Sequence, residues 1–398
     1  MPAKQTGVIV RLGCAQTLAW ASSYYLLAIL AEPMARELGL SISTVFAGFS
    51  LALVVSSFLG QKVGAFIDAY GGRTVLTCTN AVFAVALAML ALSQGPAVMF
   101  LAWALMGMAM AAGLYDGAFA TLVKLYGTGS RGAITGITLI AGFASTVGWP
   151  ITAWIEGRFG WREACLFWAF AHLAVGIPFN ISLPRHQKLK DAKAFAARST
   201  PEDMSTDPGA RITTLLLAAV FALTWFVTTA MAAHLPRLLQ IYGYDAGVAL
   251  AMASLVGPAQ VVARLLEFGF MRTAHPMILA RLASAAHPAG ALLMMALGGP
   301  AGVVFALLHG AGNGVLTIAK GTLPLVIFGP DSYGARLGLL MAPARITQAF
   351  APYFFGLAMD RLGKGALWLS IGIGLISCLA LLGLRPKTHS SLCDAHSR

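Results

Sequence analysis

The sequence predicts an all-α membrane protein with about 12 transmembrane helices in two pseudo-symmetric six-helix bundles. Of its 398 residues, 58% are hydrophobic and only 11% are charged, whereas soluble domains carry about 25% charged residues. The mean hydropathy is +0.77. Apolar stretches of roughly 20 residues, the length that crosses a bilayer, recur along the chain, and the two halves of the chain match in several positions.

The apolar segments follow one another with short polar turns between them. Glycine, proline and charged residues mark their ends, as expected for turns. The predicted spans lie near residues 8–31, 43–63, 74–93, 97–123, 133–155, 162–183, 212–235, 246–268, 277–298, 301–327, 333–357 and 365–384.

The basic residues predict how these spans are oriented. Of the 27 lysines and arginines, 18 lie in loops or span ends on the side of the termini, 6 on the opposite side and 3 inside spans. Lysine and arginine concentrate in cytoplasmic loops. We therefore expect a multi-pass protein of the cell inner membrane with both termini cytoplasmic. The same bias explains the net charge of +12 without a nucleic-acid partner.

A charged segment divides the chain. Residues 185–211 lack long apolar runs and contain Ser199-Thr-Pro201-Glu and Asp207-Pro-Gly209, which is typical of a linker. The predicted organisation is an N-terminal bundle (1–184), a cytoplasmic linker (185–211), a C-terminal bundle (212–385) and a cytoplasmic tail (386–398).

Matched positions in the two halves indicate a duplication. At an offset of 202 residues, Gly132-Ala133 matches Gly334-Ala335, Gly136 matches Gly338, and Pro150 matches Pro352; at an offset of 203, Pro33 matches Pro236. Two parallel six-span repeats are a transporter architecture whose binding site lies between the halves near mid-membrane.

A short polar hinge between the second and third spans carries a family signature. The segment Gly64-Ala-Phe-Ile-Asp68-Ala-Tyr-Gly71-Gly72-Arg73 resembles the loop of the major facilitator superfamily, with Gly64, Asp68, Gly71 and Arg73 matching and Ala69 and Gly72 replacing basic residues. The resemblance implies that Gly64, Asp68 and Arg73 act in gating. We expect Asp68 to lie near the start of span eleven, around Ser332, where a helix N-terminus favours an acid.

Four ionisable residues lie inside predicted spans: Asp116, Arg264, Lys320 and Arg345. Such residues are costly, about 2.5–3.5 kcal/mol on insertion scales, and usually face a partner or a cavity. They are therefore the first candidates for substrate binding or coupling.

Arg264 follows Gln260 by four residues in span eight. This resembles monocarboxylate transporters of the superfamily, in which an acid and an arginine at this spacing line the cavity and the arginine holds the carboxylate. Because Gln260 replaces the acid, we expect this pair to bind an anion but not to couple transport to protons. The alternative is that Arg264 pairs with Glu267 or extends to the membrane surface.

Arg345 lies near the middle of span eleven, beside Pro343, which is expected to loosen the helix. Oxalate- and formate-exchanging relatives place cations on helices eight and eleven, so Arg264 and Arg345 resemble that arrangement. We expect both to point into the interface between the halves and to repel each other when no anion is bound. The alternative is a structural ion pair across the bundle.

Asp116 and Lys320 occupy corresponding spans, four and ten. Asp116 is a candidate for proton coupling, or for a structural pair with Arg73 or Arg264; Lys320 is expected near the cytoplasmic mouth as a possible substrate contact. Tyr24 and Tyr25 lie on span one, which lines the cavity in the superfamily, and could bind substrate or pack against other aromatic side chains.

Other chemistries lack a sequence basis. There is no phosphate-binding P-loop, HExxH motif or nucleophile elbow, so we expect no enzyme. The cysteines and histidines are scattered, so we assign neither a metal nor a cofactor.

These observations favour a secondary active transporter that moves a small organic anion, a carboxylate, by alternating access, with protons or a counter-substrate as coupling partners and the lipid bilayer as surroundings. One alternative is an efflux permease for drugs or toxic metalloids with the same fold. A second is a non-transporting membrane sensor, which we would expect to carry an added soluble domain.

Overall fold

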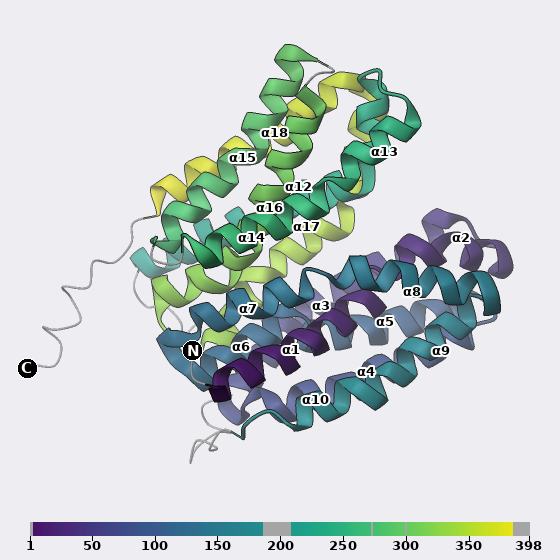
Figure 1. The fold of residues 1–398 in the computed structure, drawn as a ribbon, viewed down its shortest axis with the longest axis vertical. Coiled ribbons are helices and arrows are strands. Elements are labelled where there is room, and N and C mark those ends of the chain that lie inside the picture. The colour runs from purple at the N-terminus through teal and green to yellow at the C-terminus, as the bar shows by residue number, and fades with distance from the viewer. Residues whose placement is uncertain (1–2, 186–207, 272–273, 299–300, 385–398) are drawn as a thin grey trace, which may run out of the picture.

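The chain folds into two helical bundles (Figure 1). The structure, a computed structural model, describes residues 3–185, 208–271, 274–298 and 301–384. The N-terminal bundle contains α1 (Ala3–Ser22), α2 (Leu27–Leu38), α3 (Ile42–Tyr70), α4 (Gly72–Ala91), α5 (Pro96–Gly113), α6 (Tyr115–Tyr126), α7 (Arg131–Ala141), α8 (Ala144–Phe159), α9 (Trp161–Ala171) and α10 (Ile177–Ile181). The C-terminal bundle contains α12 (Pro208–Ile241), α13 (Ala246–Ser254), α14 (Val256–Gly269), α15 (Pro276–Leu297), α16 (Gly302–Phe328), α17 (Tyr333–Leu362) and α18 (Ala366–Gly383).

The helices confirm the predicted fold class. Within the described residues, 10 segments are long and apolar enough to cross a membrane. Two of them, Pro96–Phe159 and Tyr333–Gly383, run across a turn and each hold two spans, which gives the twelve predicted. Most of the predicted linker and all of the predicted tail (386–398) lie outside the described residues, so both remain predictions.

Several predicted spans consist of two helices rather than one. The first is interrupted between Ser22 and Leu27, where the hydroxyls of Ser22 and Ser23 donate to the carbonyls of Leu18 and Ala19 at 2.8 and 2.5 Å. Such bonds compete with the helical ladder. The fourth is interrupted at Leu114, whose backbone is extended. Non-helical backbone at membrane depth is tolerated where it is buried in protein or lines a cavity.

The bundles meet along α3 and α17, which run antiparallel. A Cβ at Gly64 would overlap the carbonyl of Gly334, and a Cβ at Gly338 would overlap the backbone of Gly60. Small residues allow this close backbone approach. Further along, the Ser50 hydroxyl donates to the carbonyl of Ala349 at 3.1 Å. Helix α17 continues through Pro343 to Leu362, and the loosening expected at this proline stays a prediction.

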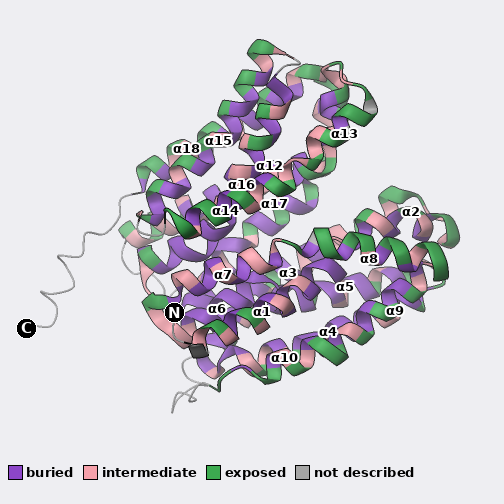
Figure 2. Ribbon diagram, viewed as in Figure 1, coloured by how far each residue is buried: buried purple, intermediate pink, exposed green. Residues whose placement is uncertain are grey.

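The bundles are not joined along their full length. We call the end where Asp68 lies beside Gly334 the closed end, and the end that holds α2 and α13 the open end. Figure 1 shows the bundles diverging toward the open end. Figure 2 shows buried positions between the helices and exposed ones on the outer faces. Large apolar side chains such as Phe58 and Phe170 are exposed. An apolar outer face suits a lipid environment.

Candidate functional site

Asp116 lies between two cations from the other bundle. Its Oδ1 is 2.9 Å from Lys320 Nζ, and its Oδ2 accepts a hydrogen bond from Arg345 Nη2. Arg345 Nη1 also donates to the carbonyl of Ser56 at 2.6 Å. All three charged residues are at least nine-tenths buried. Helices α6, α16 and α17 thus meet at one carboxylate, and α3 contacts Arg345 beside it.

Aromatic rings complete the surroundings of Lys320. Its Nζ lies 5.6 Å from the ring centroid of Tyr115, 5.7 Å from that of Phe119 and 5.1 Å from that of Trp225. Cations over aromatic faces are attracted by the ring quadrupole. The ammonium group is therefore held by Asp116 and by rings of both bundles.

The observed partners of Asp116 correct two expectations. The proposed pairing with Arg73 or Arg264 is wrong, because Lys320 and Arg345 occupy both carboxylate oxygens. Arg73 itself forms no ion pair with any residue that the structure describes. Lys320 was expected near the cytoplasmic mouth. That expectation did not include its place in this buried cluster.

Arg264 has only uncharged partners. Its guanidinium donates to the carbonyl of Gly314 at 3.3 Å, to the carbonyl of Thr138 at 3.2 Å and to Oε1 of Gln260 at 3.3 Å. These distances are at or just beyond the long end of normal N–H···O hydrogen bonds. The residue is 5% exposed, and no acid within the described residues pairs with it.

The partners of Glu267 exclude the alternative that Arg264 pairs with Glu267 in this conformation. Arg131 lies 3.1 Å from Glu267 Oε1, and the Thr135 hydroxyl donates to Oε2 at 3.3 Å. Glu267 therefore pairs across the interface, not with Arg264. As predicted, Arg264 and Arg345 both reach the interface, since each bonds to a carbonyl of the N-terminal bundle. Arg345 shares the carboxylate of Asp116 with Lys320, so its charge is only partly compensated, and the expected repulsion between Arg264 and Arg345 stays a prediction.

The hinge residue Asp68 is placed as predicted. It is 4% exposed, and its two oxygens accept hydrogen bonds from the backbone N–H groups of Gly334 and Ala335, each at 2.9 Å. These N–H groups belong to the first turn of α17, where they lack helical acceptors. Gly64, one turn earlier, permits the close approach of α17.

Tyr24 and Tyr25 lie in the turn between α1 and α2. The Tyr24 hydroxyl accepts a hydrogen bond from Gln348 Nε2 at 3.1 Å, and the Tyr25 carbonyl accepts one from Trp149 Nε1 at 3.2 Å. Tyr24 thus reaches the C-terminal bundle. Gln348 was not among the predicted site residues, although a polar residue one turn after Arg345 is a usable signal.

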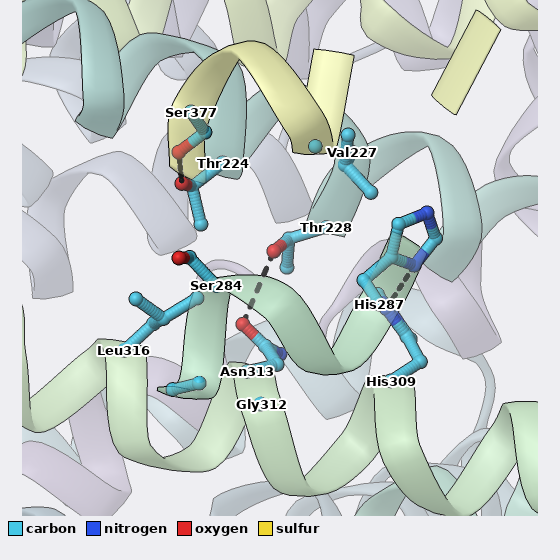
Figure 3. Close-up of a pocket in the computed structure, with 12 residues that line it drawn as sticks. Thr224, Val227, Thr228, Ser284, His287, His309, Gly312, Asn313, Leu316 and Ser377 are labelled. Atoms are coloured by element: carbon cyan, nitrogen blue, oxygen red, sulfur yellow. Dashed lines mark hydrogen bonds between the residues drawn. The ribbon is translucent and has the colours of Figure 1, made fainter. Parts of the chain in front are cut away.

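A separate polar pocket lies inside the C-terminal bundle (Figure 3). Its volume is about 30 Å³, enough for a water molecule or two. The Thr228 hydroxyl donates to Asn313 Oδ1 at 3.1 Å, and the Nδ1 atoms of His287 and His309 are 3.0 Å apart. No cluster of metal-ligating residues occurs among the described residues. None of the buried charges of the interface lines this pocket.

Comparison with known proteins gives one relative by sequence and two solved structures with a similar fold. The chain is 28% identical over 355 residues, 89% of each chain, to the "Uncharacterized 38 kDa protein in 23S RNA operon" of Thermoproteus tenax. Its fold is similar to that of the human organic anion transporter MFSD10 (TETRAN), with a TM-score of 0.72 at 16% identity over 96% of this chain and 100% of the other. It is also similar to the proton:xylose symporter XylE, with a TM-score of 0.76 at 12% identity over 96% of both chains.

A match to a family model shows which family the chain belongs to. The model of the Major Facilitator Superfamily matches residues 12–319, well over half of the chain. Members of this family are transporters and not enzymes, in agreement with the prediction. Together with the two six-helix bundles, this match shows that the chain belongs to the major facilitator superfamily and is a multi-pass membrane protein with a secondary-transporter fold.

Proposed function

We propose that the protein is a secondary active transporter that moves a small organic carboxylate by alternating access, with Arg264 as the main substrate-binding residue. One observation carries this proposal: Arg264 is a buried cation at the interface without an acidic partner. The other interface cations differ, because Lys320 and Arg345 each pair with the carboxylate of Asp116, and Arg131 pairs with Glu267.

An isolated buried charge is expensive, and a ligand of opposite charge offsets that cost. Taking a charge out of water costs several kcal/mol unless a partner compensates. The guanidinium fork matches a carboxylate through two parallel hydrogen bonds. The neutral acceptors around Arg264, all at 3.2–3.3 Å, hold it in place without satisfying its charge. A substrate carboxylate would supply the missing counter-ion.

Asp116 is the proposed coupling residue. Protonation of its carboxyl would weaken its bonds to Lys320 and Arg345 together, and with them a contact between the bundles. The further proposed substrate contacts are Arg345, Lys320, Gln260, Tyr24 and Tyr25. Gly64, Asp68 and Arg73 are retained as the proposed gate at the closed end.

The orientation follows from the charge bias in the sequence. With both termini in the cytoplasm, the closed end faces the cytoplasm and the open end faces outward, so the structure corresponds to an outward-facing state. Passage to the inward-facing state then requires Asp68 to leave α17 and Glu267 to leave α7.

The comparisons leave the substrate open, because an organic anion transporter and a sugar symporter share this fold. The choice of a carboxylate rests on Arg264. It also rests on the resemblance of Gln260 and Arg264 to monocarboxylate transporters, and on that of Arg264 and Arg345 to oxalate–formate exchangers. A transport screen in proteoliposomes tests it, with labelled carboxylates, cationic drugs and arsenite as solutes. Uptake of carboxylates that saturates and is lost in Arg264→Gln supports the proposal. Transport of drugs or arsenite without carboxylate transport supports the efflux alternative.

A further inference from the structure

The polar pocket of the C-terminal bundle holds two histidines that are hydrogen-bonded to each other. It lies between α12, α15, α16 and α18, and the rings of His287 on α15 and His309 on α16 form part of its lining (Figure 3). Their Nδ1 atoms are 3.0 Å apart. At this distance one Nδ1 carries a proton and donates a hydrogen bond to the other. In the neutral pair, one ring is therefore the Nδ1–H tautomer and the other is the Nε2–H tautomer.

This pairing leaves room for one further proton. The ring that donates through Nδ1 has an unprotonated Nε2, and a proton bound there gives the pair a charge of +1. A second proton would have to bind the accepting Nδ1, which would place two N–H groups against each other. The pair therefore titrates as one unit that takes up a single proton.

The Nε2 atom of His287 is available for such a proton. His287 is 7% exposed, and among the described residues nothing bonds to its Nε2. A proton on this atom therefore breaks no existing hydrogen bond. The buried His172 of the N-terminal bundle differs, because its Nε2 is 2.7 Å from Ser22 Oγ and its Nδ1 is 2.7 Å from Asn80 Oδ1. Both of its ring nitrogens already have partners.

The pocket surrounds the pair with polar groups. Its lining includes hydroxyls and an amide, those of Thr224, Thr228, Ser284, Ser377 and Asn313. Pro288, the residue after His287, has no N–H and cannot donate the helical hydrogen bond to the carbonyl of Ser284. The volume of about 30 Å³ admits a water molecule or two. Hydroxyls, a carbonyl without its helical donor and water all lower the cost of a charge inside a span.

Within the described part of the chain, no other titratable side chain lines this pocket. The remaining titratable residues of its four helices lie outside it, and they are Arg211, His234, Arg237, Arg281, Lys320 and Cys378. Cys378 Sγ contacts the pocket residue Ser284, whose Oγ is 3.2 Å away. Proton uptake in the pocket is therefore a property of the histidine pair.

Buried charges also lie on the helices that pack against the outer faces of α16. They are Asp116 on α6, Arg264 and Glu267 on α14, and Arg345 on α17. Glu267 pairs with Arg131. Asp116 pairs with both Arg345 and Lys320. Arg264 is therefore the buried charge of this group that has no ion-pair partner among the described residues.

Helix α16 connects the pocket to Arg264. Asn313 lines the pocket, and the carbonyl of the next residue, Gly314, accepts a hydrogen bond from Arg264 at 3.3 Å. A Cβ at Gly314 would overlap the backbone of α14, and so would a Cβ at Gly310, the neighbour of His309. Helix α14 thus lies against the segment of α16 that carries both the histidine and the contact with Arg264.

We propose that His287 and His309 form a proton-binding site that takes up one proton and thereby strengthens the binding of an anion at Arg264. A positive charge on the pair repels Arg264 through the protein interior, and a bound carboxylate offsets that repulsion. Proton and anion then favour each other's binding by the same factor. The site is separate from Asp116. Its proton binding stands without the proposed function, whereas its coupling to an anion rests on it.

Nitrogen-15 NMR of the full-length protein, labelled at histidine and reconstituted in lipid vesicles, tests proton binding without any substrate. The ring nitrogens are followed from about pH 8 to about pH 5, the range in which histidine changes charge. We expect the signals of His287 and His309 to change together, with loss of one of the two unprotonated nitrogens of the pair. Rings that stay neutral throughout this range would overturn the proposal.

Single substitutions identify the signals and test whether the proton is shared. In His287→Gln and in His309→Gln, the remaining ring should take up its proton about one pH unit or more lower, because its partner base is gone. His234→Gln is the matched control, since His234 lies on α12 outside the pocket and bonds to the Pro352 carbonyl at 2.7 Å. It should leave the pair unchanged. The signals of His172 show that each variant is folded. Proton uptake by the remaining ring at the wild-type pH contradicts a shared site.

Anion affinity tests the coupling. For the solute that the transport screen selects, we expect about 5-fold or more tighter binding at about pH 5.5 than at about pH 7.5, the lower end of usual coupling between two sites. This pH effect should be lost in His287→Gln and kept in His234→Gln. An unchanged effect in His287→Gln overturns the coupling and leaves the proton site standing. Proton uptake by the pair without transport of any carboxylate contradicts the proposed function and supports the site itself.

Discussion

Glu267, near the end of α14, is held 3.1 Å from Arg131, the first residue of α7. The contact corresponds to that of Asp68, near the end of α3, with the first turn of α17. In each case an acid at the end of the second span of one bundle binds the start of the fifth span of the other. The duplication thus gives the closed end two related contacts, although only the Asp68 loop carries the family signature.

Asp68→Asn should slow transport more than it weakens substrate binding. The substitution removes the carboxylate that accepts two hydrogen bonds from α17, and loss of an acceptor at a helix N-terminus costs about 0.5–2 kcal/mol. The closed end then opens more readily. Initial rates and affinity are measured in proteoliposomes. Asp331→Asn removes the same charge from an exposed position in the turn before α17 and serves as the control. Equal effects of the two substitutions would exclude a specific role for Asp68.

Glu267→Gln should act in the same direction as Asp68→Asn. It removes the charge that holds Arg131, while the side chain keeps an oxygen for Thr135. We therefore expect a smaller effect on the transport rate and a larger one when both acids are replaced. A double variant with the rate of Asp68→Asn alone would show that Glu267 does not contribute to closure.

Asp116→Asn should destabilise the protein. It leaves Lys320 and Arg345 buried without their counter-ion, which costs about 3–5 kcal/mol in the free energy of unfolding. Adding Lys320→Met removes one of the two cations, so the double variant should recover part of the loss. Thermal unfolding followed by tryptophan fluorescence measures both. If the stability loss of the double variant equals the sum of the losses of the two single variants, Asp116 is not directly coupled to Lys320.

Gly64→Ala should separate α3 from α17. The added Cβ would overlap the Gly334 carbonyl, a backbone atom that cannot move without shifting the helix. We expect lower thermal stability and a lower transport rate. Gly372→Ala on α18, where an added Cβ meets nothing within 4 Å, is the matched control. Wild-type behaviour of Gly64→Ala would show that the helices are not in close contact there.

Much of the fold was predictable because apolar length alone determines where a chain can cross a bilayer. The last span, predicted at 365–384, is Ala366–Gly383 in the structure. The interruptions were not predicted, since Ser22-Ser23 and Leu114 lie within runs that are apolar enough to continue as helices. Local hydrogen bonds and tertiary packing decide those positions, and hydropathy does not report them.

The buried charges were identified from sequence, but their partners were not. Asp116, Arg264, Lys320 and Arg345 stand out because charge is rare inside spans. Which cation reaches Asp116 depends on the rotation and depth of four helices, which no local pattern encodes. The position of Asp68 was predictable because the N-terminus of span eleven favours an acid.

The central claim is that Arg264 binds the carboxylate of the substrate. Its most direct test is the affinity for the best carboxylate of the transport screen in wild type, Arg264→Lys and Arg264→Gln, with Arg237→Gln as a control that removes an exposed arginine paired with Asp360. We predict at least 10-fold weaker binding for Arg264→Lys, which keeps the charge and loses the bidentate fork. For Arg264→Gln we predict no measurable binding, and for Arg237→Gln wild-type binding. Wild-type affinity in folded Arg264→Gln would contradict the account.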